Sequence, residues 1–163
     1  MSHSSLSETL KRQFSTSVLN CSTDFDMLTI TVALNDLHAI LKFLKEDSAC
    51  NFFFLTDLTG YQSADEQQLF VVYHLHNLQS NQRIRVKSAM PIQKPECNSV
   101  TDIWPSANWM ERETYDFFGI QFKGHPQLKR ILNVEEMDIF PLRKEFPLED
   151  QTRDDKTDYM FGR

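Results

Sequence analysis

The sequence contains few of the residues on which several classes of protein depend. Its 163 residues include only four Gly and six Pro, which argues against a low-complexity chain. Only three Cys are present, at positions 21, 50 and 97, and their wide spacing is poor for a zinc site or an iron–sulfur cluster. An odd number of Cys and an N-terminus without the apolar stretch of a secretory signal indicate a reducing, cytoplasmic compartment.

Long apolar runs and an excess of positive charge are also missing. No run approaches the roughly 20 apolar residues that a membrane-spanning helix needs, so we expect contact with a membrane only through a partner. The formal net charge is −6, whereas binding to nucleic acid requires an excess of Lys and Arg. The one basic strip, Arg83–Lys87, is predicted to be a solvated strand face. We therefore expect no nucleic-acid partner.

The motifs of several well-known catalytic sites do not occur either. The chain has no GxSxG, HExxH, P-loop or GxGxxG pattern. His74 and His76 share one face of a predicted strand, but no third ligand accompanies them. Histidines in such an aromatic-rich strand are more often packed than metal-bound, so the sequence disfavours a metal site.

Regular apolar patterns are present over the first two thirds of the chain. Forty per cent of the residues are hydrophobic and 13 are Phe, which is enough for one domain with its own core. A first short helix is predicted to begin at a capping box formed by Ser5 and Glu8. A second helix is predicted to follow Asn35, which would be its N-cap. Alternation and apolar runs predict strands at residues 27–34, 51–59, 68–78 and 83–90, with the second of them buried at the centre of the sheet.

The order of these elements predicts an α+β fold. We expect a two-layer module, with a mixed sheet of about four strands and flanking helices, followed by an extended C-terminal tail. A short helix is expected around residues 99–104, and a clear one at 107–118 that ends in a left-handed cap at Gly119. The expected division is a module of residues 1–120 and a partner-binding segment of residues 121–163.

The helix predicted at 107–118 carries dense charge, and two interpretations stay open. Arg112 and Asp116 are four residues apart on one face and can form an ion pair. As acid–base groups, Glu111 and Glu113 would act together with His125 in an enzyme. As paired charges, the same residues would instead fix a rigid contact surface.

The stretch that follows this helix is better explained by a partner than by a core. His125 precedes Pro126, which disfavours a helical conformation, so we expect His125 to fix a turn by hydrogen bonds. Residues 140–148 place bulky apolar side chains around Pro141 and Pro147, which forbid a continuous helix. This composition indicates a segment that orders against another protein.

Motifs in the C-terminal half resemble the thirty-kilodalton subunit family (NuoC) of proton-pumping NADH–quinone oxidoreductase, respiratory complex I. The family pattern is ERE, then D, G, F, HP, L and RI, followed by PLRK, an acidic and an aromatic residue, and P. All of these occur in order within roughly residues 104–148. The expected interface or structural positions are Glu111, Arg112, Glu113, Asp116, Gly119, His125, Pro126, Arg130, Pro141, Leu142, Arg143, Lys144 and Pro147.

The resemblance implies a non-catalytic core subunit of the peripheral arm, in the quinone module. Such a protein docks against the large hydrophilic D subunit and other hydrophilic subunits of the complex, and it supports electron transfer from NADH to quinone. It holds no cofactor, because FMN, iron–sulfur clusters and quinone belong to other subunits. The implied location is peripheral, at the cytoplasmic face of the bacterial inner membrane.

The resemblance also implies roles for two sets of charges. A network that holds the helix to the following turn and to the partner would consist of Glu111, Arg112, Glu113 and Asp116. The cations expected to meet acidic groups or carbonyls across the interface are Arg130, Arg143 and Lys144. The equivalent subunit of a membrane-bound nickel–iron hydrogenase, or of a ferredoxin-oxidising photosynthetic-type complex, shares the motifs and is the alternative.

Overall fold

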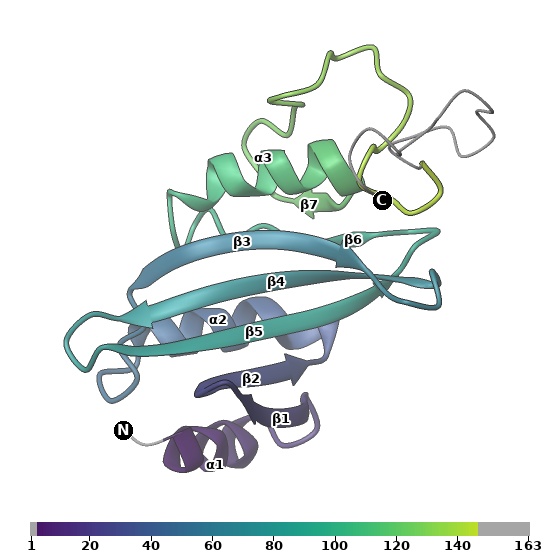
Figure 1. Ribbon diagram of the computed structural model, residues 1–163. Coiled ribbons are helices and arrows are strands. Elements are labelled where there is room, and N and C mark those ends of the chain that lie inside the picture. Colours follow the sequence, from purple (N-terminus) through teal and green to yellow (C-terminus); the bar gives the residue numbers. More distant parts are fainter. Residues whose placement is uncertain (1–2, 147–163) are drawn as a thin grey trace, which may run out of the picture.

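A mixed five-stranded sheet with helices on one face forms the body of the protein (Figure 1). The structure is a computed structural model, and it describes residues 3–146. The helices are α1 (His3–Gln13), α2 (Leu37–Glu46) and α3 (Ala107–Phe118), with a 3-10 turn, η1 (Leu34–Asp36), before α2. The strands of the sheet are β1 (Val18–Asp24), β2 (Met27–Val32), β3 (Phe54–Gln62), β4 (Gln68–Asn77) and β5 (Gln82–Pro91). A separate parallel pair consists of β6 (Glu96–Asn98) and β7 (Gln121–Lys123).

The strands of the main sheet lie in the order β1-β2-β5-β4-β3. β2 and β5 run parallel, in a register that pairs Leu28 with Ile84, and all other neighbours run antiparallel. A parallel pair needs a long crossover, which α2, β3 and β4 provide here. The predicted α+β class and the mixed sheet are therefore confirmed.

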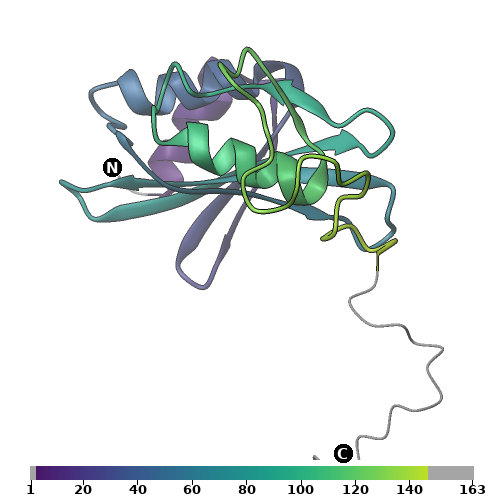
Figure 2. The same cartoon turned by 90° about the horizontal axis from the view of Figure 1, so that it is seen from above.

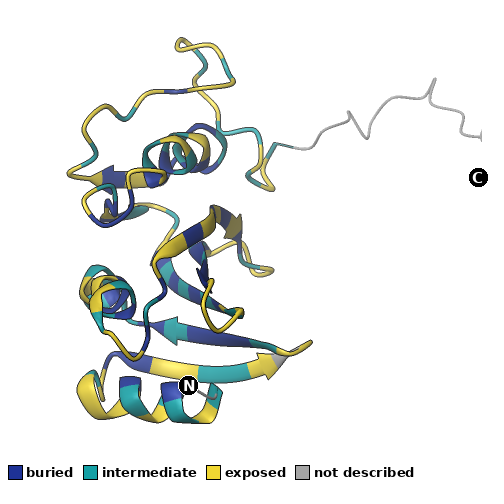
Figure 3. Cartoon of the chain, turned by 90° about the vertical axis from the view of Figure 1, so that its left-hand side faces the viewer, coloured by how far each residue is buried: buried dark blue, intermediate teal, exposed yellow. Residues whose placement is uncertain are grey.

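The core lies between the sheet and the helices on one of its faces. In β5, Ile84, Val86 and Met90 are buried, whereas Arg83 and Lys87 alternate to the opposite face. α2 covers the core face, and it lies behind the sheet in Figure 1 and beside it in Figure 3. The side chains that α2 buries are those of the predicted stripe, Leu37, Ile40, Leu41 and Leu44.

Two strand predictions are corrected by the structure. The run at residues 51–59 does not form a central strand, because β3 lies at the edge of the sheet. Phe53 and Phe54 are 49% and 45% exposed, and of the three consecutive Phe only Phe52 is buried. β1 was not predicted, since VLNCSTD shows little apolar alternation. It joins β2 through the turn residues Phe25 and Asp26, and Figure 2 shows this hairpin projecting away from the helices.

The beginnings of the first two helices also differ from prediction. α1 begins at His3, two residues before the expected capping box at Ser5. Asn35 does not cap α2, because it lies within η1. The N-cap position belongs to Asp36, whose side chain makes no capping hydrogen bond. The packing of the apolar stripe, rather than a cap, therefore determines where α2 lies.

The helix expected around residues 99–104 is a hydrogen-bonded turn. Both Ile103 and Trp104 donate their backbone N–H to the carbonyl of Val100. By contrast, α3 spans residues 107–118 as predicted, and Gly119 after it has the expected left-handed conformation, with φ +75°. From residue 124 to 146 the chain forms turns and irregular structure without a helix or strand.

α3 packs closely on β3 because β3 has a glycine at the point of contact. A Cβ added at Gly60 would lie 3.2 Å from side-chain atoms of Thr114, Phe118 and Ile120. The hydroxyl of Thr114 donates to the carbonyl of Met110 at 2.8 Å, so this polar group is satisfied within the helix. This contact fixes α3, which carries the charged residues considered next.

Candidate functional site

Glu111 joins α3 to the turn at residues 99–104. Its side chain is fully buried, and one carboxylate oxygen accepts the backbone N–H of Val100 at 2.7 Å. The other accepts the hydroxyl of Ser99 at 2.7 Å. Burial raises the pKa of Glu111 to about 7, and Asp102 adds to this rise, although the two hydrogen bonds oppose it. Both oxygens thus bind the protein's own chain.

Asp116 joins the last turn of α3 to the segment at residues 130–133. One carboxylate oxygen accepts the backbone N–H groups of Ile131, Leu132 and Asn133 at 3.0, 2.8 and 2.9 Å. The other accepts Arg130 at 2.8 Å and the side-chain amide of Asn133 at 3.1 Å. Burial would raise the pKa of Asp116, but these hydrogen bonds outweigh it and hold the pKa well below its usual range.

Arg130 is buried and uses its donors within the chain. One guanidinium nitrogen donates to both the side chain and the carbonyl of Asp116 at 2.8 Å. The other donates to the carbonyls of Met137 and Ile139 at 2.6 and 2.9 Å. The guanidinium also lies 5.0 Å from the ring centre of Phe140. Arg130 therefore closes the loop at residues 131–139 against the end of α3.

The predicted ion pair between Arg112 and Asp116 does not form. Arg112 instead donates to the carbonyls of Lys129 and Arg130 at 3.0 and 2.9 Å. Its guanidinium lies 5.3 Å from the ring centre of Trp109, which is 59% exposed. Spacing along the helix allowed the pair, but Asp116 points into the protein and Arg112 along its surface. Glu113 is exposed and has no ion-pair partner among residues 3–146.

Gly119 allows the C-terminal segment to lie against the end of α3. A Cβ at this position would come within 2.6 Å of the Phe140 ring and 2.7 Å of the Arg143 guanidinium. Arg143 donates to the carbonyl of Phe118 at 2.8 Å and lies 4.7 Å from the centre of the Phe140 ring. The backbone N–H of Leu142 donates to the carbonyl of Phe117 at 3.2 Å. The helix end is thus capped by its own downstream chain.

Lys144, another of the expected interface residues, contacts the module itself. The backbone N–H of Lys144 donates to the side chain of Gln62 at 2.7 Å, and its ammonium donates to the carbonyl of Ser63 at 3.0 Å. Pro141, also among the expected positions, is half-buried in a turn. Pro147, the last of the predicted positions, lies outside the described residues.

His125 and Pro126 lie in the turn after β7. His125 is within hydrogen-bond distance of the carbonyl of Asn108, at 3.1 Å, through Nε2. Its Nδ1 accepts the backbone N–H of Gln127 at 3.0 Å. With Nδ1 as an acceptor, Nε2 carries the proton and donates to Asn108. The imidazole therefore links this turn to the first turn of α3.

These contacts leave a surface with exposed apolar side chains. We define the docking segment as residues 128–146 together with Trp109. Figure 3 shows that much of residues 124–146 is exposed. The large hydrophobic side chains that this segment exposes are Trp109, Ile131, Leu132, Val134, Ile139 and Leu142. A group of exposed apolar side chains is a feature that protein contact surfaces often have.

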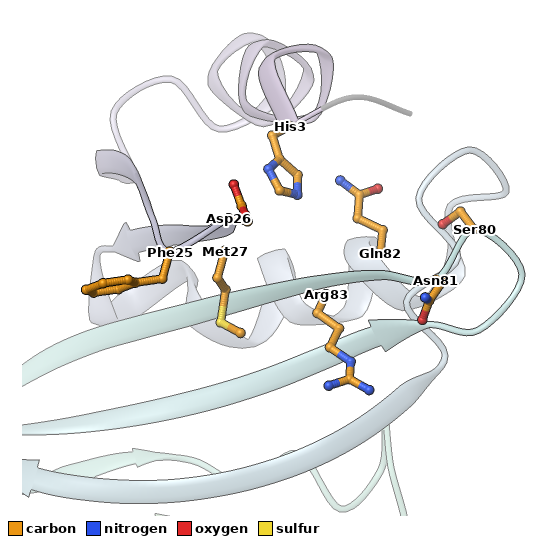
Figure 4. A pocket seen from close by; sticks show the side chains of 8 residues that line it. All are labelled: His3, Phe25, Asp26, Met27, Ser80, Asn81, Gln82 and Arg83. Carbon is orange, nitrogen blue, oxygen red and sulfur yellow. The ribbon is translucent and has the colours of Figure 1, made fainter.

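The arrangement does not resemble a centre for acid–base chemistry. Glu111 and Asp116 are buried with their oxygens bound to the chain, whereas a general base must reach a substrate. Residues 3–146 contain no group of three or more His, Cys, Asp or Glu side chains placed to hold a metal ion. A groove of about 650 Å³ lies elsewhere, between the start of α1 and the tips of two hairpins, and its polar lining includes His3, Asp26 and Arg83 (Figure 4).

Comparison with known proteins identifies the family. The family described as "Respiratory-chain NADH dehydrogenase, 30 Kd subunit" matches residues 30–152. The chain belongs to this family. The matched range covers more than half of the chain and includes α3 and the docking segment. The predicted resemblance is therefore confirmed.

Curated relatives match this chain along most of its length. The C subunit of NADH-quinone oxidoreductase from Citrifermentans bemidjiense is 40% identical over 148 residues, which cover 89% of each chain. The protein of the same name from Geobacter sulfurreducens is 37% identical and covers 89% of this chain and 90% of its own. That of Chelativorans sp. is 46% identical, but the match covers 76% of this chain and only 62% of the relative.

Two solved structures are similar to this chain. A trypsin-resistant fragment of Nqo5 has a TM-score of 0.65 and 29% identity, covering 76% of this chain and 98% of the fragment. A chain of an archaeal respiratory membrane complex, the membrane-bound sulfane sulfur reductase, has a TM-score of 0.75 and 25% identity, covering 89% and 85%. Among residues 3–146 no helix has the length and apolar character that crossing a bilayer requires.

Several residues that bind the charged groups of α3 and the docking segment were not predicted from the sequence. Ser99 and Asn133 bind the two buried carboxylates, Phe140 packs between two arginines, and Gln62 binds the end of the segment. Ser99, Asn133 and Gln62 lie 12, 17 and 82 residues from the groups they contact. No periodicity or motif connects positions so far apart, so only the tertiary structure reveals them.

Proposed function

We propose that this chain is a non-catalytic core subunit of the peripheral arm of proton-translocating NADH–quinone oxidoreductase. In its quinone module it would dock against the large hydrophilic D subunit and other hydrophilic subunits, and support electron transfer from NADH to quinone. FMN, iron–sulfur clusters and quinone would belong to other subunits. Family membership and the names of the curated relatives support the assembly.

The observation that carries the docking proposal is that charged residues of α3 and the docking segment bind one another and the backbone between them. Arg112, Asp116 and Arg130 bind polar groups of their own chain, and this holds a loop rigid. The same loop exposes Leu132 and Val134, which are 67% and 63% exposed. Rigid apolar groups bind a partner at a lower entropic cost than a mobile tail would.

In this proposal residues 1–120 are the folded module, and residues 121–163 are the segment that contacts the partner. The chain would reach the membrane only through the complex, at the cytoplasmic face of the bacterial inner membrane. Glu113, exposed and without an ion-pair partner among the described residues, would face a cation of the partner. The other predicted site residues would hold the surface in shape.

A second candidate is the equivalent subunit of a related membrane complex that uses another electron donor, such as a nickel–iron hydrogenase or a ferredoxin-oxidising complex. The specific observation in its favour is the similarity to a chain of the archaeal sulfane sulfur reductase complex. The family described for NADH dehydrogenase and the names of the curated relatives favour the first candidate.

The test is co-purification of the tagged chain from gently solubilised membranes of its native host, with an assay of NADH–quinone activity. We expect a homologue of the large hydrophilic D subunit, flavin and iron–sulfur subunits, and activity. Recovery of membrane subunits without an NADH module would instead support the second candidate. A chain recovered alone would contradict both.

A matched pair of variants tests the docking segment. Val134→Asp should abolish co-purification of the large hydrophilic D subunit and leave the thermal midpoint of the purified chain unchanged, because Val134 is exposed. Leu19→Asp is the control, since Leu19 in β1 is equally exposed, at 63%, but lies outside the docking segment. Equal recovery with both variants would contradict the proposed surface.

A further inference from the structure

The face of the sheet opposite α2 carries features that neither the core nor the docking segment explains. We define the open face as the side chains of β2, β3, β4 and β5 that alternate away from the core. In Figure 1 this face is toward the viewer, and none of the three helices covers it in Figure 1 or Figure 3. Three cations lie along its central strand, β5: Arg83, Arg85 and Lys87.

None of these three cations forms an ion pair within the described chain. None of them has a carboxylate within the 4.0 Å of an ion pair among residues 3–146, and only Lys87 has a ring contact, 5.5 Å from the centre of Phe70. Successive residues on one face of a strand are about 7 Å apart, so the three charges repel one another. This is unexpected in a chain whose formal net charge is −6.

The residues directly opposite the strip on the neighbouring strands include no carboxylate. The register places Thr29 and His74 on either side of Arg85, and Thr31 and Val72 on either side of Lys87. Burial and the charge of Arg85 lower the pKa of His74, and Asp57 on the edge strand only partly opposes them. A hollow of about 160 Å³ on this face is lined by Met27, Asp57, His74 and Arg83, among others.

An independent feature stands beside the strip. Phe25 at the tip of the β1–β2 hairpin is fully exposed, and its backbone has φ +52°, followed by +61° at Asp26. A two-residue turn with two positive φ values favours Asn and Gly, and a bulky side chain there is an outlier. Figure 4 shows the Phe25 ring directed away from the other side chains of the groove beneath it. Neither local conformation nor core packing accounts for a Phe here.

We propose that the open face, with the basic strip Arg83–Lys87 and the projecting Phe25, binds an acidic surface of another protein of the assembly. Carboxylates of the partner would pair with the strip, and an apolar recess would take the Phe25 ring. This inference rests on the proposed function, because it requires a multi-subunit assembly, but it names a second surface on a different side of the molecule from the docking segment.

A protein partner fits this face better than an anionic membrane. Binding to anionic lipid typically requires clusters of four to eight basic residues. Here three cations share the face with the carboxylate of Asp57, and Asp26 lies beside Phe25. Fixed acidic side chains on a folded partner can be matched to such a mixed pattern, whereas a lipid surface cannot.

The first variants separate assembly from folding. Phe25→Asn places a turn-favouring residue at the tip, and R83Q/R85Q/K87Q removes the strip. Both full-length chains should have a thermal midpoint equal to or above that of the wild type, because strain or repulsion is removed. In the native host, the amount of complex that co-purifies with either variant should be lower than with the wild type by a factor of about ten or more. The control K11Q/R12Q/K42Q, with the same change of charge on exposed helix positions, should recover it normally.

A photo-crosslinking amino acid at position 25 identifies the occupant in the intact complex. We expect an adduct with an Asp- and Glu-rich peptide of another subunit. An adduct with lipid, an adduct with a second copy of this chain, or normal recovery of the complex with both variants would overturn the inference. If the wild type recovers the complex but the variants have no effect, only this inference fails. If the wild type recovers no complex, the proposed function fails first.

Discussion

At the scale of single residues, two carboxylates on α3 are buried in opposite electrostatic environments. Asp116 accepts five hydrogen bonds, from three backbone N–H groups, Arg130 and Asn133, and stays ionised. Glu111 accepts two and has a pKa raised by burial to about 7. The number of donors decides which form each group favours.

Replacing Asp116 tests the first environment. Asp116→Asn leaves Arg130 buried without its counter-charge, so the free energy of unfolding should fall by about 3 kcal/mol. Urea denaturation of the purified full-length chain measures this. Glu113→Gln on the exposed side of the same helix is the control and should change it by less than about 0.5 kcal/mol. Equal effects of the two would show that the Asp116 cluster does not stabilise the fold.

Replacing Glu111 tests the second environment. An acid whose folded pKa is about 7 and whose unfolded pKa is about 4.3 destabilises the fold progressively as pH rises between these values. Glu111→Gln keeps an acceptor for Val100 and a donor for Ser99 but cannot ionise. At pH 8 the variant should therefore be as stable as the wild type or more stable, by up to about 3 kcal/mol. A large loss of stability at pH 8 would contradict the raised pKa.

At the scale of elements, the end of α3 and the docking segment are one unit. The left-handed Gly119 terminates the helix, and the space above it holds Phe140 and Arg143. The carbonyls of Phe117 and Phe118, left free at the helix end, are bound by Leu142 and Arg143. A change at the glycine therefore acts on the segment as well as on the helix.

Gly119→Ala tests this unit. The left-handed backbone costs about 1 kcal/mol for Ala, and the added methyl group would displace Phe140 and Arg143. We expect a loss of about 2 kcal/mol in unfolding free energy and faster tryptic cleavage after Arg143. Gly124→Ala is the control, because its φ is +83° but no atom lies within 4 Å of the added Cβ. If both variants are cleaved at the same rate, the segment does not depend on Gly119.

At the scale of the whole molecule, the two carboxylates predict an acidic optimum of stability. The contribution of Asp116, whose pKa is lowered, is present above its unfolded pKa of about 3.9 and is lost as pH falls below it. The ionisation of buried Glu111 lowers the free energy of unfolding as pH rises toward about 7. The negative charge of a chain with pI near 5.3 grows over the same interval.

Calorimetry of the wild-type chain between pH 3 and pH 9 checks this prediction. The thermal midpoint should be highest near pH 5 and fall on both sides. Glu111→Gln should flatten the alkaline side and leave the acidic side unchanged, whereas Asp116→Asn should flatten the acidic side. A maximum above pH 8 in the wild type would contradict the combined electrostatic account.

The sequence alone determined those parts of the molecule whose signals are local. The apolar stripe of α2, the alternation in β5 and the bounds of α3 with Gly119 follow from periods of 3.6 and 2 and from a glycine at a helix end. The motif from Glu111 to Pro147 was enough to indicate the family. Each of these signals lies within one stretch of chain.

Only the tertiary structure decided which distant residues meet. It placed β3 at the edge of the sheet, although the Phe residues of this stretch predicted a central strand. It also showed that Asp116 pairs with Arg130 and not with Arg112. It also placed the basic strip on an open face, with Arg83 and Phe25 lining one groove (Figure 4). Strand order and side-chain pairing depend on long-range packing, which leaves no period in the sequence, and for that reason the open face could be described only from the folded chain.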